Sequence, residues 1–150
     1  MSDSKSTVEY RHIPGWLSYR VGSDGSVWSL KSGFRRKKKL HKQFGYLKVT
    51  LCKNNTGRTV LVHRLVLLAF VGPPPVGTES LHIDGNRLNN ALSNLRWGTR
   101  AENEADKVRH GTSNHGERNG HAKLTNAIVK NILDEYGQGG VLQKALALRY

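Results

Sequence analysis

Residues 81–103 read LHIDGNRLNNALSNLRWGTRAEN, and they carry the clearest structural pattern in the chain. Residues 81–83 and 95–97 each alternate apolar and polar side chains, which is typical of short strands. The run Asp84-Gly85-Asn86 between them has the composition of a turn. The stretch therefore predicts two short strands joined by a polar loop.

Alternate side chains of a strand point to opposite faces, so the pattern also predicts orientation. His82 and Asp84 are expected to face outward. The apolar residues expected to face the core are Leu81, Ile83, Leu95 and Trp97.

A helix is expected directly after the second strand. Thr99 and Glu102 have the spacing of a capping box, in which each side chain binds a backbone amide of the other's turn. Asn103 then falls in the first turn, with Arg100 and Asp106 three residues to either side on the same face. A strand–loop–strand–helix unit of this kind gathers His82, Asn94 and Asn103 around one point.

The remaining chain predicts an α+β fold. Residues 63–71 are apolar nearly all round, as in a buried helix, and the proline run after them ends it. Upstream, a turn at residues 22–25 and alternating stretches up to residue 62 indicate a small antiparallel sheet. Downstream, residues 111–120 read as a linker, and residues 124–136 and 141–150 as helices.

Charge points to the class of partner. Lys and Arg number 24 against 11 Asp and Glu, a formal net charge of +13. Cations that neutralise phosphates release counterions, so a nucleic acid is the first expectation and an anionic membrane the second. No apolar run approaches the roughly 20 residues that span a bilayer. Cys52 is the only cysteine, which excludes a disulfide framework and fits a reducing, cytoplasmic compartment.

His82, Asn94 and Asn103 are residue types suited to phosphodiester hydrolysis. The reaction needs a base for water, a group that holds the base and a metal that carries charge on the phosphate. His63 lies on an apolar helix and is expected to be a core or interface residue. The histidines at 110, 115 and 121 match no standard zinc spacing.

The chain resembles the HNH endonucleases of phages and mobile introns over roughly residues 60–110. The motifs that carry the resemblance are Val62-His63-Arg64-Leu65-Val66, His82-Ile83-Asp84-Gly85-Asn86, Asn89-Asn90, Ser93-Asn94-Leu95-Arg96-Trp97 and Glu102-Asn103. Residues 13–29 and 45–46 resemble the module that often precedes this domain in homing endonucleases. The resemblance implies a phage- or mobile-element-encoded enzyme in the host cytoplasm.

The same resemblance implies residue roles. His82 would be the general base, Asn94 would hold its imidazole through the other ring nitrogen, and Asn103 would bind one divalent metal ion, Mg²⁺ or Mn²⁺. Many family members carry a metal-binding Asp just before the base, where this chain has Leu81. Asp84 or Asp106 then replaces it, or a backbone carbonyl and waters complete the shell, or activity is weak or absent.

The implied domain order is an N-terminal DNA-contacting β module (1–61), a ββα-metal nuclease domain (62–110), a linker (111–122) and C-terminal helices (123–150). The last segment resembles a helix-turn-helix without its recognition helix. The expected partner is double-stranded DNA, bound by a monomer or weak dimer. The basic residues expected to contact it are Arg35, Arg36, Lys37, Lys38, Lys39, Lys42, Arg87, Arg96, Arg100 and Lys123.

Two alternatives remain at this point. A non-catalytic DNA-binding protein that keeps the fold would explain Leu81. A basic RNA-associated structural protein would explain the charge but not the ordered His82, Asn94 and Asn103.

Overall fold

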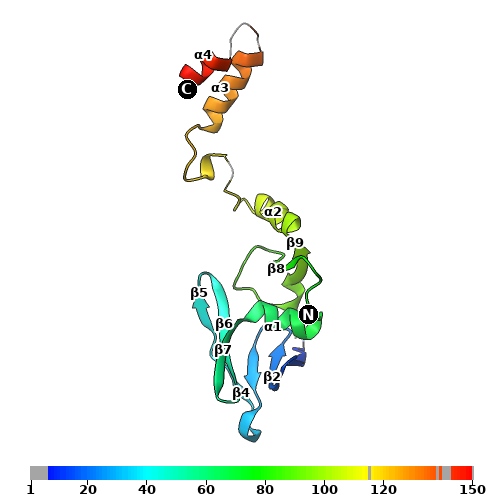
Figure 1. The fold of residues 1–150 in the computed structure, drawn as a ribbon. Coiled ribbons are helices and arrows are strands. Elements are labelled where there is room, and N and C mark those ends of the chain that lie inside the picture. Colours follow the sequence, from blue (N-terminus) through cyan, green and yellow to red (C-terminus); the bar gives the residue numbers. More distant parts are fainter. Residues whose placement is uncertain (1–6, 115, 138, 140–142, 150) are drawn as a thin grey trace, which may run out of the picture. The chain divides into compact units, whose positions relative to one another are not determined.

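A computed structural model describes residues 7–114, 116–137, 139 and 143–149. The fold is α+β, as predicted, with helices and antiparallel strands along the chain (Figure 1). The tertiary contacts divide the chain into two units, the first ending at His110 and the second beginning at Gly111. None of the helices within the described ranges has the length and apolar character needed to cross a bilayer.

The N-terminal strands form two antiparallel sheets instead of the single small sheet predicted. The first contains β1 (Tyr10–Ile13), β2 (Trp16–Gly22), β3 (Val27–Ser29) and β4 (Arg36–Lys37), in that order. The second contains β5 (His41–Gln43), β6 (Tyr46–Lys53) and β7 (Thr56–Leu61). A short 3-10 turn, Lys31–Gly33, lies in the connection between β3 and β4. The predicted turn at 22–25 joins β2 to β3.

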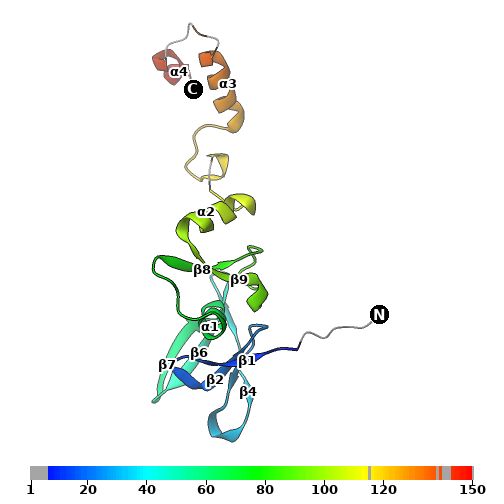
Figure 2. The ribbon, with the colours of Figure 1, turned by 90° about the vertical axis from the view of Figure 1, so that its right-hand side faces the viewer.

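Helix α1 (Val62–Phe70) is buried, as its composition predicts, and contacts strands of all three sheets of the structure. Figures 1 and 2 show it between the two N-terminal sheets and the β8–β9 hairpin. The core that it organises draws on both N-terminal sheets, α1 and the start of β9, and comprises Ile13, Tyr19, Val21, Val27, Val49, Leu51, Val62, Leu65, Val66, Leu67 and Leu95. The predicted segments 1–61 and 62–110 therefore share one core.

The hairpin and helix predicted from residues 81–103 are present. β8 (Thr78–His82) pairs antiparallel with β9 (Leu95–Thr99), and a 3-10 turn (Leu92–Asn94) precedes β9. α2 (Arg100–Arg109) begins with the predicted capping box, in which Thr99 accepts from the Glu102 amide and Glu102 accepts from the Thr99 amide.

The register corrects the predicted faces of this hairpin. Leu81 lies opposite Arg96 and His82 opposite Leu95, so Leu81 and Leu95 point to opposite faces. Leu81 is buried on the α2 side, whereas His82 is half-buried on the α1 side, not outward as expected. Ile83 follows the end of β8 and is 42% exposed, so its predicted core position is wrong. Helices α1 and α2 cover the two faces of the hairpin. The prediction assumed that only one face is covered and that the other faces solvent.

The second unit contains a 3-10 turn (Gly116–Arg118), α3 (Asn126–Gly137) and α4 (Gln143–Arg149). Helix α3 begins two residues later than the predicted stretch, after Leu124 and Thr125. The predicted break at 137–140 and the ends of the predicted last helix, Val141 and Tyr150, lie wholly or partly outside the described residues.

Candidate functional site

His82 ends β8, and its imidazole is held by Asn90. Nε2 of His82 lies 3.2 Å from Oδ1 of Asn90, while Nδ2 of Asn90 donates to the carbonyl of Leu88 at 3.3 Å. Because the amide nitrogen is engaged with Leu88, the amide oxygen faces His82 and can only accept. Nε2 therefore carries the proton in the neutral ring, and the lone pair is on Nδ1. Among the described residues, none is hydrogen-bonded to that Nδ1.

The pKa of His82 is lowered from its ordinary value, chiefly because burial penalises the imidazolium. The bond from Asn90 and the negative charge of Asp84 partly oppose this effect, while Arg87 adds to it. A histidine that is neutral at pH 7 with a free lone pair meets the first requirement for a general base.

Asn94 does not hold the imidazole, so that part of the prediction is wrong. Its Oδ1 accepts from the Asp84 amide at 3.0 Å, and its Nδ2 donates to Asp84 Oδ1 at 2.8 Å and to the Asn89 carbonyl at 2.9 Å. The side chain is buried, so these bonds replace water that it has lost. Asn94 thus ties the ends of the β8–β9 loop together, and this loop carries Asn90.

Asp84, one of the two carboxylates considered for the metal, organises the same loop. Its Oδ1 accepts from the Asn86 amide at 2.7 Å and from Asn94, and its Oδ2 accepts from Nδ2 of Asn89 at 2.8 Å. These bonds, with the one from Asn89 strongest, lower the pKa of Asp84 below its usual value. Both oxygens are therefore already engaged in shaping the turn, and the structure gives Asp84 a role in the loop instead of a free metal-binding edge.

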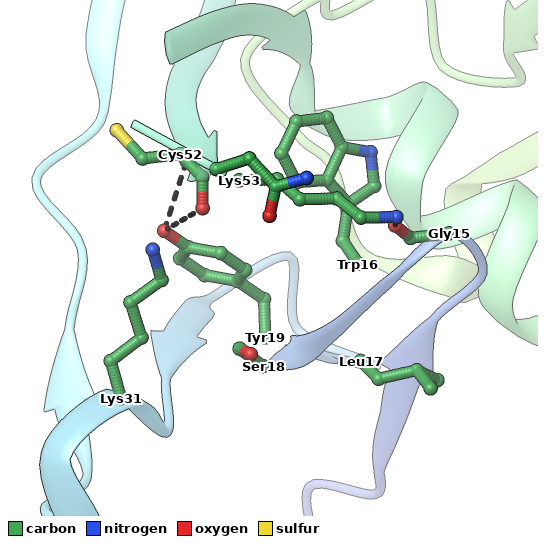
Figure 3. Close-up of a pocket in the computed structure, with 9 residues that line it drawn as sticks. Gly15, Trp16, Leu17, Ser18, Tyr19, Lys31, Cys52 and Lys53 are labelled. Carbon is green, nitrogen blue, oxygen red and sulfur yellow. Dashed lines mark hydrogen bonds between the residues drawn. The ribbon is translucent and has the colours of Figure 1, made fainter. Parts of the chain in front are cut away.

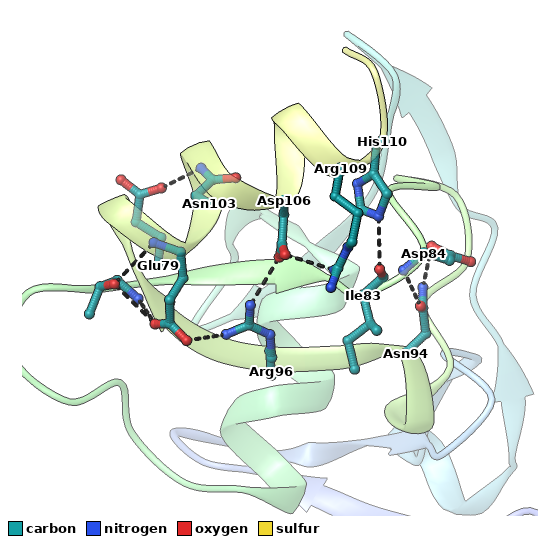
Figure 4. A network of polar contacts seen from close by, with 11 residues as sticks. Glu79, Ile83, Asp84, Asn94, Arg96, Asn103, Asp106, Arg109 and His110 are labelled. Carbon is teal, nitrogen blue, oxygen red and sulfur yellow. Dashed lines mark hydrogen bonds and ion pairs between the residues drawn. The ribbon is translucent and has the colours of Figure 1, made fainter. Parts of the chain in front are cut away.

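Asp106, the other candidate, is enclosed by two guanidinium groups (Figure 4). Oδ2 lies 2.9 Å from Nη2 of Arg96 and Oδ1 lies 2.7 Å from Nη2 of Arg109. Arg96 also pairs with Glu102 at 2.7 Å. Asp106 and Arg96 thus join α2 to the hairpin. Neither the predicted metal contact of Asp106 nor the predicted DNA contact of Arg96 fits these engaged groups.

Asn103 faces a carboxylate that the sequence analysis missed. Its Nδ2 donates to Oε2 of Glu79 at 3.0 Å (Figure 4). Glu79 lies two residues before Leu81 and shares its face of β8, so period-two alternation was the signal that could have found it. Among the described residues no three His, Cys, Asp or Glu side chains gather as a metal cluster. One carboxylate and one amide oxygen nevertheless fit Mg²⁺, which prefers oxygen ligands and keeps several waters.

Most of the predicted DNA-contacting residues are exposed. Arg35, Arg36, Lys37 and Lys39 are exposed around β4, and Lys38 is half-buried. The exposed side chains elsewhere are Lys42 on β5, Arg87 in the β8–β9 loop, Arg100 on α2 and Lys123 in the second unit. Arg87 lies over the ring of Tyr46, at 4.9 Å from its centroid.

A second basic feature crosses the first sheet. The register places one residue from each strand in a single cross-strand row, formed by His12, Arg20, Trp28 and Lys37. Arg20 hydrogen-bonds His12 through Nε at 3.1 Å. The opposite face of this sheet carries core residues such as Val21 and Val27. The row is thus formed only by strand pairing, and its residues are 8 or 9 positions apart in the sequence.

A pocket of about 410 Å³ lies where β2 meets the end of β6 (Figure 3). The Tyr19 hydroxyl accepts from the Cys52 amide at 3.0 Å and donates to the Cys52 carbonyl at 3.3 Å. Nζ of Lys53 donates to the carbonyl of Gly15 at 3.3 Å. These bonds tie the two N-terminal sheets together, and we assign the pocket a structural role.

Comparison with known proteins gives a consistent result. The HNH endonuclease family matches residues 60–105. The chain is 37% identical over 120 residues to DNA endonuclease I-HmuI of Bacillus phage SP01, spanning 79% of this chain and 68% of that protein. It is 41% identical over 75 residues to the SPbeta prophage-derived protein YosQ of Bacillus subtilis, whose name assigns it to the HNH homing endonucleases, spanning 49% of this chain and 43% of that one. A solved structure described as DNA binding and cleavage by the HNH homing endonuclease I-HmuI matches with a TM-score of 0.63 at 31% identity, covering 86% of this chain and 68% of that chain.

Proposed function

Because the chain belongs to the HNH endonuclease family, we propose that it is a metal-dependent enzyme that hydrolyses phosphodiester bonds of double-stranded DNA with His82 as general base. The observation that carries this proposal is the 3.2 Å contact between Nε2 of His82 and Oδ1 of Asn90, from which we infer the tautomer of His82. Asn90 accepts from Nε2–H, and so Nδ1 presents a lone pair to the site.

The chemistry follows from that lone pair. A water molecule gives a proton to Nδ1 of His82 as its oxygen attacks phosphorus, and the bond from phosphorus to the 3′-oxygen breaks. The products carry a 5′-phosphate and a 3′-hydroxyl, which takes its proton from solvent. Asn90 stabilises the resulting imidazolium through Nε2–H, and Asp84 adds a nearby negative charge.

Asn103 and Glu79 would hold the single divalent ion, Mg²⁺ or Mn²⁺. They lie on the α2 face of β8, whereas His82 ends the strand on its α1 face, so the scissile phosphate would have to span the end of the hairpin to meet both. When bound, such an ion stabilises negative charge on the phosphate and the departing oxygen. Rotation of the Asn103 amide by half a turn would put its Oδ1 beside Oε2 of Glu79, where Nδ2 now lies. The side chain of Leu81 supplies no ligand atom, so a site of this kind relies on the carboxylate of Glu79 in place of a side chain next to the base.

The charge of +13 favours duplex DNA as substrate, and the exposed residues around β4 offer phosphate contacts. One site per chain cuts one strand per encounter, so a monomer nicks, and double-strand cleavage requires a dimer or a second event. We place the enzyme with phage- or mobile-element-encoded nucleases that act on DNA in the host cytoplasm.

The test incubates the full chain with supercoiled plasmid in Mg²⁺, Mn²⁺ or chelator. Wild type and His121→Ala, an exposed histidine of the second unit, are expected to nick the plasmid in either metal. His82→Ala is expected to lose nicking, since a positioned base contributes roughly 10²–10⁴-fold. Tight DNA binding without cleavage in any metal would instead identify a non-catalytic DNA-binding protein, the alternative that Leu81 favours. Stronger, less salt-sensitive binding to structured RNA would overturn the choice of DNA.

A further inference from the structure

His63 is a buried histidine that contacts the proposed base. It lies in the first turn of α1 and is 2% exposed. Its ring centroid is 4.9 Å from that of His82, with the two planes at 70°, an edge-to-face arrangement. Tyr46, on β6, lies 5.4 Å from His63 and 6.2 Å from His82. The rings of His63, Tyr46 and His82, from α1, β6 and β8, therefore form one cluster that contains the proposed base.

The Nδ1 atom of His63 does not explain the presence of this residue in the cluster. Its Nδ1 is fully buried and has no hydrogen-bond partner among the described residues. Burial, followed by the charges of His82 and Arg64, lowers the pKa of His63 to about 4. The side chain is thus a neutral, flat ring at the pH where a nuclease works. A buried nitrogen without a partner is costly, so the ring itself is the feature that the site uses.

The contact of His82 with Asn90 leaves one degree of freedom unrestrained. A hydrogen bond at Nε2 fixes one corner of the imidazole but restrains rotation about the Cβ–Cγ bond only weakly, because such torsions have broad minima. A rigid ring packed against the imidazole removes this freedom. The lone pair on Nδ1 then keeps one direction.

We propose that His63 is a positioning residue for His82, whose ring holds the imidazole in the plane where Nε2–H meets Asn90 and Nδ1 stays free. This inference rests on the proposed role of His82 as base. It assigns His63 no contact with substrate or metal.

The test combines the histidine ¹⁵N NMR signature of His82 with plasmid nicking, using the full chain. His63→Phe keeps a ring, His63→Leu keeps volume without a ring, and Val27→Ala is a control for a core cavity on β3. We expect wild type, His63→Phe and Val27→Ala to show the Nε2–H tautomer of His82. We expect His63→Leu to show a mixture of tautomers, and its kcat to fall about tenfold or more with KM nearly unchanged, since misplaced catalytic groups lose this much.

Two results would overturn the inference. In the first, His63→Leu keeps the wild-type tautomer and kcat, which would make the ring a packing element only. In the second, His63→Phe loses the wild-type tautomer of His82 and the wild-type kcat, as His63→Leu does. That result would assign the positioning of His82 to a ring nitrogen of His63 and not to the ring itself. If wild type itself fails to nick, the proposed function fails, but the NMR comparison still decides whether His63 orients His82. If His63→Leu does not fold, His63→Met provides the same comparison with a flexible apolar side chain.

Discussion

Lowering the pH from 7 to 5 should destabilise the first unit by about 2 kcal/mol through His63 alone. In the folded protein the pKa of His63 is about 4, whereas the unfolded chain has the ordinary value of 6.5. Between these values the unfolded state binds a proton that the native state excludes. The contribution of His63 is therefore fully present above pH 6.5, is lost as the pH falls, and is exhausted below pH 4.

The size of the destabilisation follows from the difference between the folded and unfolded pKa values of His63. Each pH unit within it costs about 1.4 kcal/mol, so the interval from 6.5 to 5 costs about 2 kcal/mol. His82 acts in the same direction because its pKa is also lowered. The effect of His63 is isolated by comparing wild type with His63→Phe, in which no proton can bind at this position.

The assay is urea unfolding at pH 7 and pH 5, followed by tryptophan fluorescence. Trp16, Trp28 and Trp97 are the three tryptophans of the chain, and all lie in the first unit. Wild type should lose about 2 kcal/mol more than His63→Phe between the two pH values. Equal losses in both proteins would contradict this prediction, because they would show that burial does not keep His63 neutral.

Three further predictions concern the hairpin and helix. Asn94→Ala removes three hydrogen bonds within the loop, so the free energy of unfolding should fall by roughly 2–4 kcal/mol in urea titrations; an unchanged value would contradict its structural role. Glu79→Gln should weaken Mn²⁺ binding, measured by EPR, by about tenfold, while Glu104→Gln on α2 leaves it unchanged; equal effects would remove Glu79 from the metal site. Gly98→Ala places a Cβ 2.5 Å from Cδ1 of Leu81, and overpacking of this kind should lower the melting temperature by several degrees, at a cost of about 1–3 kcal/mol.

The two carboxylates considered for the metal already have hydrogen-bonding partners, which restricts their use as metal ligands. Asp106 is held by Arg96 and Arg109, and Asp84 by the amides of its own loop. A metal would have to displace these partners to reach either group. Glu79 has one neutral amide as its recorded partner, which a small rotation moves aside. The cost of exchanging partners therefore favours Glu79 over both residues considered from the sequence.

Local sequence patterns were enough to predict several elements of this chain. Alternation, the turn run at 84–86 and the capping box at Thr99 indicated the hairpin and α2, because each pattern reflects contacts within a few residues. The first strand, however, begins three residues earlier than predicted and ends at His82. The proline run after α1 and the apolar character of that helix were equally local. The ordered motifs between residues 62 and 103 indicated the family, which the comparisons confirm.

The hydrogen-bond partner of each side chain in the site depends on how the elements pack. Asn90 and Asn94 are the same residue type in the same loop. The path of the backbone places Asn90 beside His82 and Asn94 beside Asp84. Helices α1 and α2 pack on opposite faces of the hairpin, and His82 lies on the α1 face. It therefore contacts His63, which lies nineteen positions earlier in the chain. Such contacts depend on how elements pack, and the free energy of packing is shared among many residues far apart in sequence. No local pattern encodes them.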